Sequence, residues 1–120
     1  MLTLRLRIFS PLQNAFQALM HNGGFGHRRL QDELGVHVPI VDAGAKFLSP
    51  LRYEDRLVVE AKVVHWGTKC FRIAYKGVRA NVPVFEGYEA RVWARIATDG
   101  TIATVAIAPE FKTAIAAAGG

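Results

Sequence analysis

Cysteine is almost missing from this chain of 120 residues, since Cys70 is the only one. One cysteine excludes an internal disulfide framework and any metal cluster held by several thiolates. Disulfides accumulate in secreted proteins, so a lone thiol favours a reducing compartment, and we expect a cytoplasmic location. The four histidines show no metal-ligand spacing, so we expect neither a bound metal nor a cofactor.

Long hydrophobic runs are also missing. No apolar stretch approaches the ~18–20 residues that a membrane-spanning helix needs, so we expect no membrane partner. Residues 1–9 alternate apolar and polar side chains and lack the features of a signal peptide. Hydrophobic residues make up 51% of the chain and charged residues 21%, which is typical of a globular protein. We expect a single domain over residues 1–113, followed by a flexible Ala/Gly tail over 114–120.

Positive charge is present but not concentrated. Fifteen basic residues against ten acidic ones give a net charge of +5, which suits a polyanionic partner. Arg28-Arg29 is the only adjacent basic pair, so binding to nucleic acid is a minority interpretation. A small ligand that carries phosphate groups needs only a few of these charges.

The residue pattern changes from helix to strand along the chain. The strict alternation in Leu2–Ile8 predicts a half-buried strand. Ser10 and Pro11 then form a typical helix start, and residues 12–21 place apolar side chains on one helical face. The glycines after Asn22 should end this helix.

Everything after Gly35 favours strands joined by short turns. The predicted strands cover residues 36–48, 55–66, 69–79, 84–97 and 101–108, and Asp99-Gly100 is a typical hairpin turn. Long antiparallel strands need one face covered, and the early helix is the available cover. The sequence therefore predicts an α+β fold, with an antiparallel sheet of about five strands wrapped around one central helix.

Several short motifs occur in an order that resembles a known family. They are Leu34-Gly35, Pro39-Ile40-Val41, Ala45-Lys46-Phe47, the segment 50–57, the segment 66–71, and Phe85–Glu89. The chain resembles the 4-hydroxybenzoyl-CoA thioesterase-like family, which has the hotdog fold, over roughly residues 34–95. The resemblance implies hydrolysis of an acyl-CoA thioester to the free acid and CoA, at a site formed in a homodimer or homotetramer.

The resemblance also implies where the chemistry takes place. Enzymes of the family have a carboxylate before the central helix and use the N–H groups at the helix start to stabilise the oxyanion. Here Leu12 and Gln13 occupy that helix start. Residues 1–11 contain no Asp or Glu, so we consider Asp42 as the missing general base. The alternative is that Asp42 points outward on its strand.

Four further residues are candidate substrate contacts. The resemblance places Thr68 and Lys69 where the family binds the phosphates of CoA, and a lysine ammonium is a suitable phosphate partner. Ser49 can hydrogen-bond the substrate or form the turn before Pro50. Phe25 can line an acyl pocket, although helix termination also explains its glycine-rich surroundings.

Two functions remain open at this point. The first is an acyl-CoA thioesterase. The second is a catalytically inactive hotdog protein that binds acyl-CoA or serves as an assembly module, which the missing N-terminal carboxylate favours.

Overall fold

The computed structural model describes residues 2–7, 11–50 and 56–118 of the chain, and side chains over 15–50 and 57–118. In chain order the elements are β1 (Leu2–Arg7), α1 (Pro11–Asn22), a short π-helical turn η1 (Arg29–Glu33), β2 (Val36–His37), β3 (Ile40–Phe47), β4 (Arg56–Trp66), β5 (Cys70–Arg79), β6 (Val82–Val92), β7 (Ala94–Ile96), β8 (Ile102–Thr104) and α2 (Pro109–Ala118).

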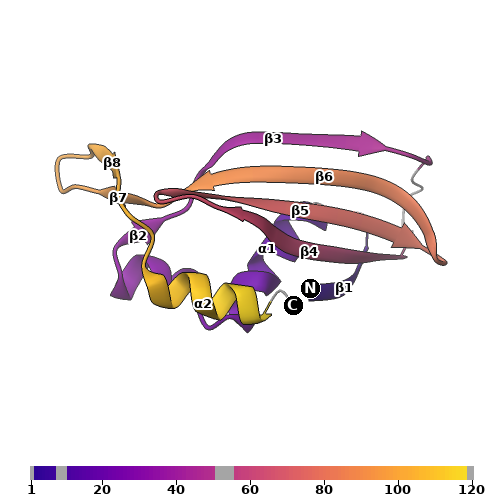
Figure 1. Ribbon diagram of the computed structural model, residues 1–120, viewed down its shortest axis with the longest axis horizontal. Helices are drawn as coiled ribbons and strands as arrows, with labels where there is room; N and C mark the ends of the chain where they lie inside the picture. The colour runs from indigo at the N-terminus through magenta and orange to yellow at the C-terminus, as the bar shows by residue number, and fades with distance from the viewer. Residues whose placement is uncertain (1, 8–10, 51–55, 119–120) are drawn as a thin grey trace.

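The main sheet has the strand order β1-β4-β5-β6-β3, and every neighbouring pair is antiparallel (Figure 1). The turn between β5 and β6 uses Ala80 and Asn81, both with positive φ, as tight two-residue hairpins require. Among the described strands, β3 forms one edge of the sheet and is bonded on one side only, to β6. This five-stranded sheet over a helix is the hotdog fold that the sequence predicted.

Helix α1 lies against the inner face of the sheet, defined here as the face that carries Val59, Ile73 and Tyr75. Its buried residues Ala15, Phe16, Leu19 and Met20 recur at helical spacing. The helix begins at Pro11 and ends before Gly23-Gly24, as predicted. Ser10, the expected N-cap, lies outside the described residues.

The structure corrects the expectation of a flexible tail from Ala114. Residues 109–118 form α2, which packs beside α1 on the inner face (Figure 1). Phe111 and Ile115, one helical turn apart, are fully buried. The Ala/Gly-rich composition obscured this apolar pair, so two helices, not one, cover the sheet.

Two expected strands are each divided in the structure. The run 36–48 splits into β2 and β3, and the run 84–97 splits into β6 and β7. The short pieces form a second sheet with the order β2-β7-β8. The predicted turn at Asp99-Gly100 joins β7 to β8, where the Asp99 side chain accepts hydrogen bonds from the backbone and the hydroxyl of Thr101.

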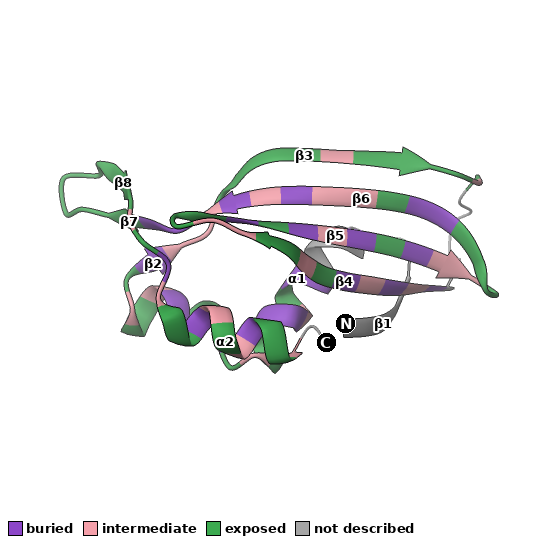
Figure 2. Cartoon of the chain, viewed as in Figure 1, coloured by how far each residue is buried: buried purple, intermediate pink, exposed green. Residues whose placement is uncertain are grey.

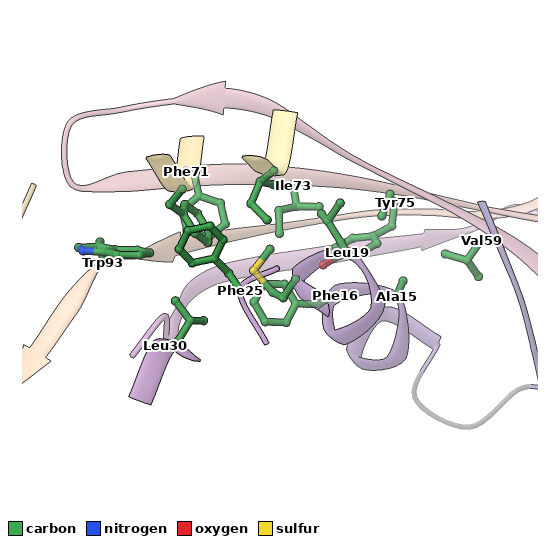
Figure 3. Packing of buried hydrophobic residues seen from close by; sticks show 14 of the residues in the cluster. Ala15, Phe16, Leu19, Phe25, Leu30, Val59, Phe71, Ile73, Tyr75 and Trp93 are labelled. Atoms are coloured by element: carbon green, nitrogen blue, oxygen red, sulfur yellow. The ribbon is translucent and has the colours of Figure 1, made fainter. Parts of the chain in front are cut away.

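The core lies between the inner face and the two helices (Figure 3). Phe111 is its aromatic centre, with ring centroids 4.6 Å from Trp93, 5.1 Å from Phe25 and 5.6 Å from Phe71. The outer face of the sheet carries charged and polar side chains, and nothing in the described part of the chain covers it. Chemistry that uses the start of α1 must therefore take place on the inner face.

Candidate functional site

The start of α1 meets one requirement of an oxyanion site. Leu12 and Gln13 lie in the first turn of α1, as predicted, and this turn contains no acidic residue. The free N–H groups of a helix start carry partial positive charge. The first turn itself therefore carries no acidic side chain that would compete with an anionic oxygen for this charge.

A cavity of about 250 Å³ lies beside α1 on the inner side of the fold. Residues of α1, of the segment around η1, of the chain leading into β3, and of β6 line it: Phe16, Gln17, Met20, His27, Leu30, Gln31, Val36, His37, Val38, Pro39 and Arg91. Small-ligand pockets commonly combine such apolar walls with a few polar groups. The size suits one short acyl group.

A buried polar network lies next to this cavity. The Tyr75 hydroxyl donates to Oε1 of Glu89 over 2.7 Å, and the Arg91 guanidinium donates to the same oxygen over 3.1 and 3.3 Å. Arg91 also donates to the Val38 carbonyl oxygen over 2.9 Å, and its guanidinium lies 3.5 Å from the Phe16 ring centroid. One ion pair thus joins β6, α1 and the segment before β3.

This network has a measurable effect on pH-dependent stability. Burial, followed by the hydrogen bond to Glu89 and its charge, raises the pKa of Tyr75 far above its ordinary value. The unfolded chain ionises this tyrosine near pH 10, whereas the folded chain keeps the proton, so its contribution to stability is complete below pH 10 and is lost above it. Between about pH 10 and 11.5, the free energy of unfolding should fall by about 1.4 kcal/mol per pH unit more in the wild type than in Tyr75→Phe. Urea titrations at several pH values measure the two slopes, and equal slopes would contradict the assignment.

Asp42 lies on the outer face of β3, in register with Ala90, whereas the next residue, Ala43, faces the inner side opposite Glu89. Its Oδ1 is 3.4 Å from the Tyr88 hydroxyl, and the Asp42 side chain is exposed. Within one chain the sheet therefore separates Asp42 from the start of α1. The outward orientation is the one that the structure shows, and a role for Asp42 as a base stays a prediction.

Thr68 and Lys69 lie in the turn between β4 and β5, and both are exposed. Strand β4 begins at Arg56, in register with Arg7 of β1, four residues before α1 begins. Its eleven residues span about 35 Å, so this turn and the start of α1 lie at opposite ends of the sheet. One chain alone does not bring the two predicted subsites together.

Ser49 and Phe25 take structural positions. The Ser49 backbone N–H points to the Val84 carbonyl oxygen, at 3.4 Å, where β3 turns away from β6. Phe25 is 1% exposed and packs edge-to-face on Phe111, with the Arg29 guanidinium over its ring. Neither side chain lines the cavity beside α1, and their substrate contacts stay predictions that these positions do not favour.

Sequence reasoning missed Glu89 and Arg91. Both lie on the same face of β6 as the buried Phe85 and Trp93. Opposite charges two residues apart between aromatic residues on a strand indicate a buried ion pair, because an unpaired charge there would be costly. The alternation of charged and aromatic residues along this strand was the sequence signal that could have predicted the buried ion pair.

A wider depression of about 710 Å³ occupies the outer face. Ala74, Gly44 and Gly87 lie in it among the charged side chains of Lys46, Glu60, Lys62, Lys76 and Glu86. No helix start faces this surface in the described part of the chain, so we do not assign the thioester chemistry to it.

Two features are missing from the described part of the chain. No helix among them is long and apolar enough to cross a membrane. No three His, Cys, Asp or Glu side chains in the described ranges are grouped so that they could hold a metal ion.

Solved structures with the same fold include several thioesterases. A 4-hydroxybenzoyl-CoA thioesterase from Pseudomonas sp. strain CBS-3 has a TM-score of 0.82 and 20% identity, covering 94% of this chain and 97% of that one. A 1,4-dihydroxy-2-naphthoyl-CoA thioesterase from Synechocystis has a TM-score of 0.79 and 14% identity, covering 94% and 93%. A gentisyl-coenzyme A thioesterase, with a TM-score of 0.80 and 21% identity, covers 95% and 99%.

Sequence identities of 14–21% to these three structures show that the fold is shared and nothing more. A search of curated protein sequences gives no significant match. The family model of the thioesterase superfamily, in contrast, matches residues 14–86, which is more than half of the chain and includes most of α1 and the strands from β2 to the middle of β6. The chain therefore belongs to the thioesterase superfamily.

Proposed function

We propose that this protein binds an acyl-CoA and hydrolyses its thioester, with the carbonyl oxygen at the N–H groups of Leu12 and Gln13. The observation that carries the proposal is the start of α1, whose first turn has no acidic residue. Donors placed where negative charge develops are often the largest single contribution to catalysis. The cavity beside α1 would hold the acyl group.

We further propose that the working unit is a homodimer, joined through β3. An edge strand presents unpaired backbone N–H and C=O groups that readily pair with another chain. Almost every residue of β3 is exposed in the single chain (Figure 2), including the apolar Ile40 and Phe47 at its ends and Val41 beside them. A second copy would cover these apolar residues and complete the backbone pairing.

Antiparallel pairing of two β3 strands relates the two protomers by a twofold rotation, so the two sheets run in opposite directions. The partner's Lys69 and its neighbour Thr68 then lie at the end of the sheet where α1 begins. This arrangement supports the proposed role of Thr68 and Lys69 as contacts to the phosphates of CoA, because the acyl group would be held by one protomer and the nucleotide by the other.

A binding protein without catalysis is the second candidate function. It is favoured by the positions of two carboxylates among the described residues, Asp42 and Glu89. Asp42 lies on the outer face, and Glu89 already accepts hydrogen bonds from Tyr75 and Arg91. Neither position gives a free carboxylate beside the start of α1.

The cytoplasmic location expected from the single cysteine stays a prediction.

The first experiment measures thiol release from short-chain, long-chain and aromatic acyl-CoAs, together with acyl-CoA binding by calorimetry. Hydrolysis should occur for short or single-ring acyl groups, and binding without turnover would establish the second candidate. Lys69→Glu should raise KM for the acyl-CoA about tenfold, as the loss of one phosphate contact of ~1.4 kcal/mol would. The same variant should leave KM unchanged for an N-acetylcysteamine thioester, which has no nucleotide. An unchanged KM for both substrates would contradict the assignment of Lys69.

A further inference from the structure

We propose that β3 pairs with β3 of a second copy about a twofold axis at Gly44, so that Asp42 lies opposite the partner's Lys46 at two symmetric places. This inference rests on the homodimer proposed above and adds its register and its ion pair. Val41 and Phe47 are 60% and 66% exposed in the single chain, and this register covers both.

The pleat of β3 limits the possible registers. Asp42, Gly44 and Lys46 share the outer face with Ala90, Tyr88 and Glu86 of β6, whereas Ala43 and Ala45 share the inner face. Directly opposed residues in an antiparallel pair point to the same side. A dimer with one continuous inner face must therefore have its axis on a residue of β3, not between two residues.

The charges of Asp42 and Lys46 favour one of these axis positions. An axis on Asp42 would oppose two aspartates, and an axis on Lys46 would oppose two lysines, which is unfavourable. An axis on Ala43 or Ala45 would leave Asp42 and Lys46 without opposed charges. Only an axis on Gly44 places each aspartate directly opposite a lysine.

The apolar residues of β3 and Gly44 are also compatible with a twofold axis on Gly44. The register places Ala43 opposite the partner's Ala45, so small side chains meet near the axis, and it brings the exposed Phe47 beside the partner's Val41, at the bulge between Ile40 and Asp42. At the axis, a Cβ on Gly44 would come within 2.6 Å of the Tyr88 ring. Gly44 has no side chain there, and the Tyr88 ring lies against its backbone.

Disulfide trapping determines which residues of the two β3 strands lie opposite each other. In a Cys70→Ser background, which removes the exposed native thiol, Ala43→Cys and Ala45→Cys chains are expressed separately and together with distinguishable tags. Opposed residues are close enough for a disulfide, whereas diagonal ones at ~7–8 Å are not. We expect rapid oxidation only between an Ala43→Cys chain and an Ala45→Cys chain. An axis on Ala43 would crosslink Ala43→Cys alone, and an axis on Ala45 would crosslink Ala45→Cys alone, and either result overturns the register.

Charge reversal tests the ion pair independently. Asp42→Lys and Lys46→Asp should each raise the dimer Kd about tenfold or more in low salt, because each opposes like charges twice. The double variant Asp42→Lys/Lys46→Asp should return the Kd to within about threefold of the wild type. Lys62→Asp, an equal charge change on the outer face of the interior strand β4, should leave the Kd unchanged. Circular dichroism verifies that each variant is folded.

The outcomes separate this inference from the homodimer itself. Sedimentation of the wild type as a monomer at 100-fold the concentration used for assays would overturn the homodimer and the register together. A stable wild-type dimer whose Kd does not respond to either single reversal, or whose loss the double variant does not restore, would overturn the ion pair while the homodimer stands.

Discussion

Glu89→Leu is expected to lower the free energy of unfolding by about 3–5 kcal/mol, because it leaves the Arg91 guanidinium buried without a counter-charge. The side chains of Arg91 and Glu89 are 7% and 6% exposed, and their closest atoms are 3.1 Å apart. Solvent therefore cannot replace the lost carboxylate. Tyr75 loses its acceptor in the same variant, which adds to the penalty. Urea unfolding followed by tryptophan fluorescence measures the loss.

The matched control removes the whole network. Replacing Tyr75, Glu89 and Arg91 together by Phe, Leu and Met leaves no buried charge unpaired, although the part-buried Val38 carbonyl loses its donor, and apolar replacement of a buried ion pair is often close to neutral. The triple variant should therefore be at least 2 kcal/mol more stable than Glu89→Leu. A triple variant less stable than the single one would show that the contacts of Arg91 to Val38 and Phe16 outweigh the ion pair.

The ion pair between Glu89 and Arg91 also positions residues that line the cavity beside α1. Arg91 fixes the Val38 carbonyl, one residue before Pro39, and lies on the Phe16 ring of α1. Val38, Phe16 and Arg91 all line the cavity beside α1. The ion pair therefore holds the walls of the proposed acyl cavity at a fixed distance from each other.

The main sheet could be predicted because its signals are local. The strand patterns in Leu2–Ile8 and in the runs 55–66 and 69–79 depend on neighbouring residues, and they predicted β1, β4 and β5. The family match extends the same agreement over residues 14–86. These local patterns predicted the strands and the helix, and the resemblance to the 4-hydroxybenzoyl-CoA thioesterase-like family predicted the hotdog fold.

The errors arose where distant contacts decide the structure. Composition gave a flexible tail from Ala114, but Phe111 and Ile115 pack against the rings of Phe25 and Trp93 and other core residues, and this burial stabilises α2. Helices in proteins owe most of their stability to such packing.

The candidate site was harder to predict than the fold. Lys69 and the start of α1 are at opposite ends of one chain, so no pattern within a single sequence relates them. Asp42 attracted attention as a carboxylate among apolar residues, yet those residues are exposed on an edge strand and do not bury it. The sequence left open whether Asp42 acts as a base or points outward, and in our proposal its strand is an interface with a second copy.

Phe111→Ala tests whether α2 belongs to the folded core, and we expect it to lower the free energy of unfolding by about 3–5 kcal/mol. The Phe111 side chain is fully buried, and four aromatic rings lie around it with centroids at 4.6–6.0 Å: Phe25, Trp66, Phe71 and Trp93. Truncation to alanine removes these contacts and leaves a cavity that the surrounding aromatic rings, held by β4, β5 and the segments that follow α1 and β6, can fill only in part.

The control lies two residues further along the same helix. Thr113 is exposed and donates only to the Pro109 carbonyl oxygen within α2, so Thr113→Ala should change the free energy of unfolding by less than about 0.5 kcal/mol. Fluorescence gives a second readout, because Trp66 and Trp93 both contact the Phe111 ring, and their emission should shift to the red in Phe111→Ala alone. A loss below about 1 kcal/mol with unchanged emission would show that α2 does not pack against the aromatic core. With the expected loss, the last ten described residues are as much a part of the fold as the strands that precede them.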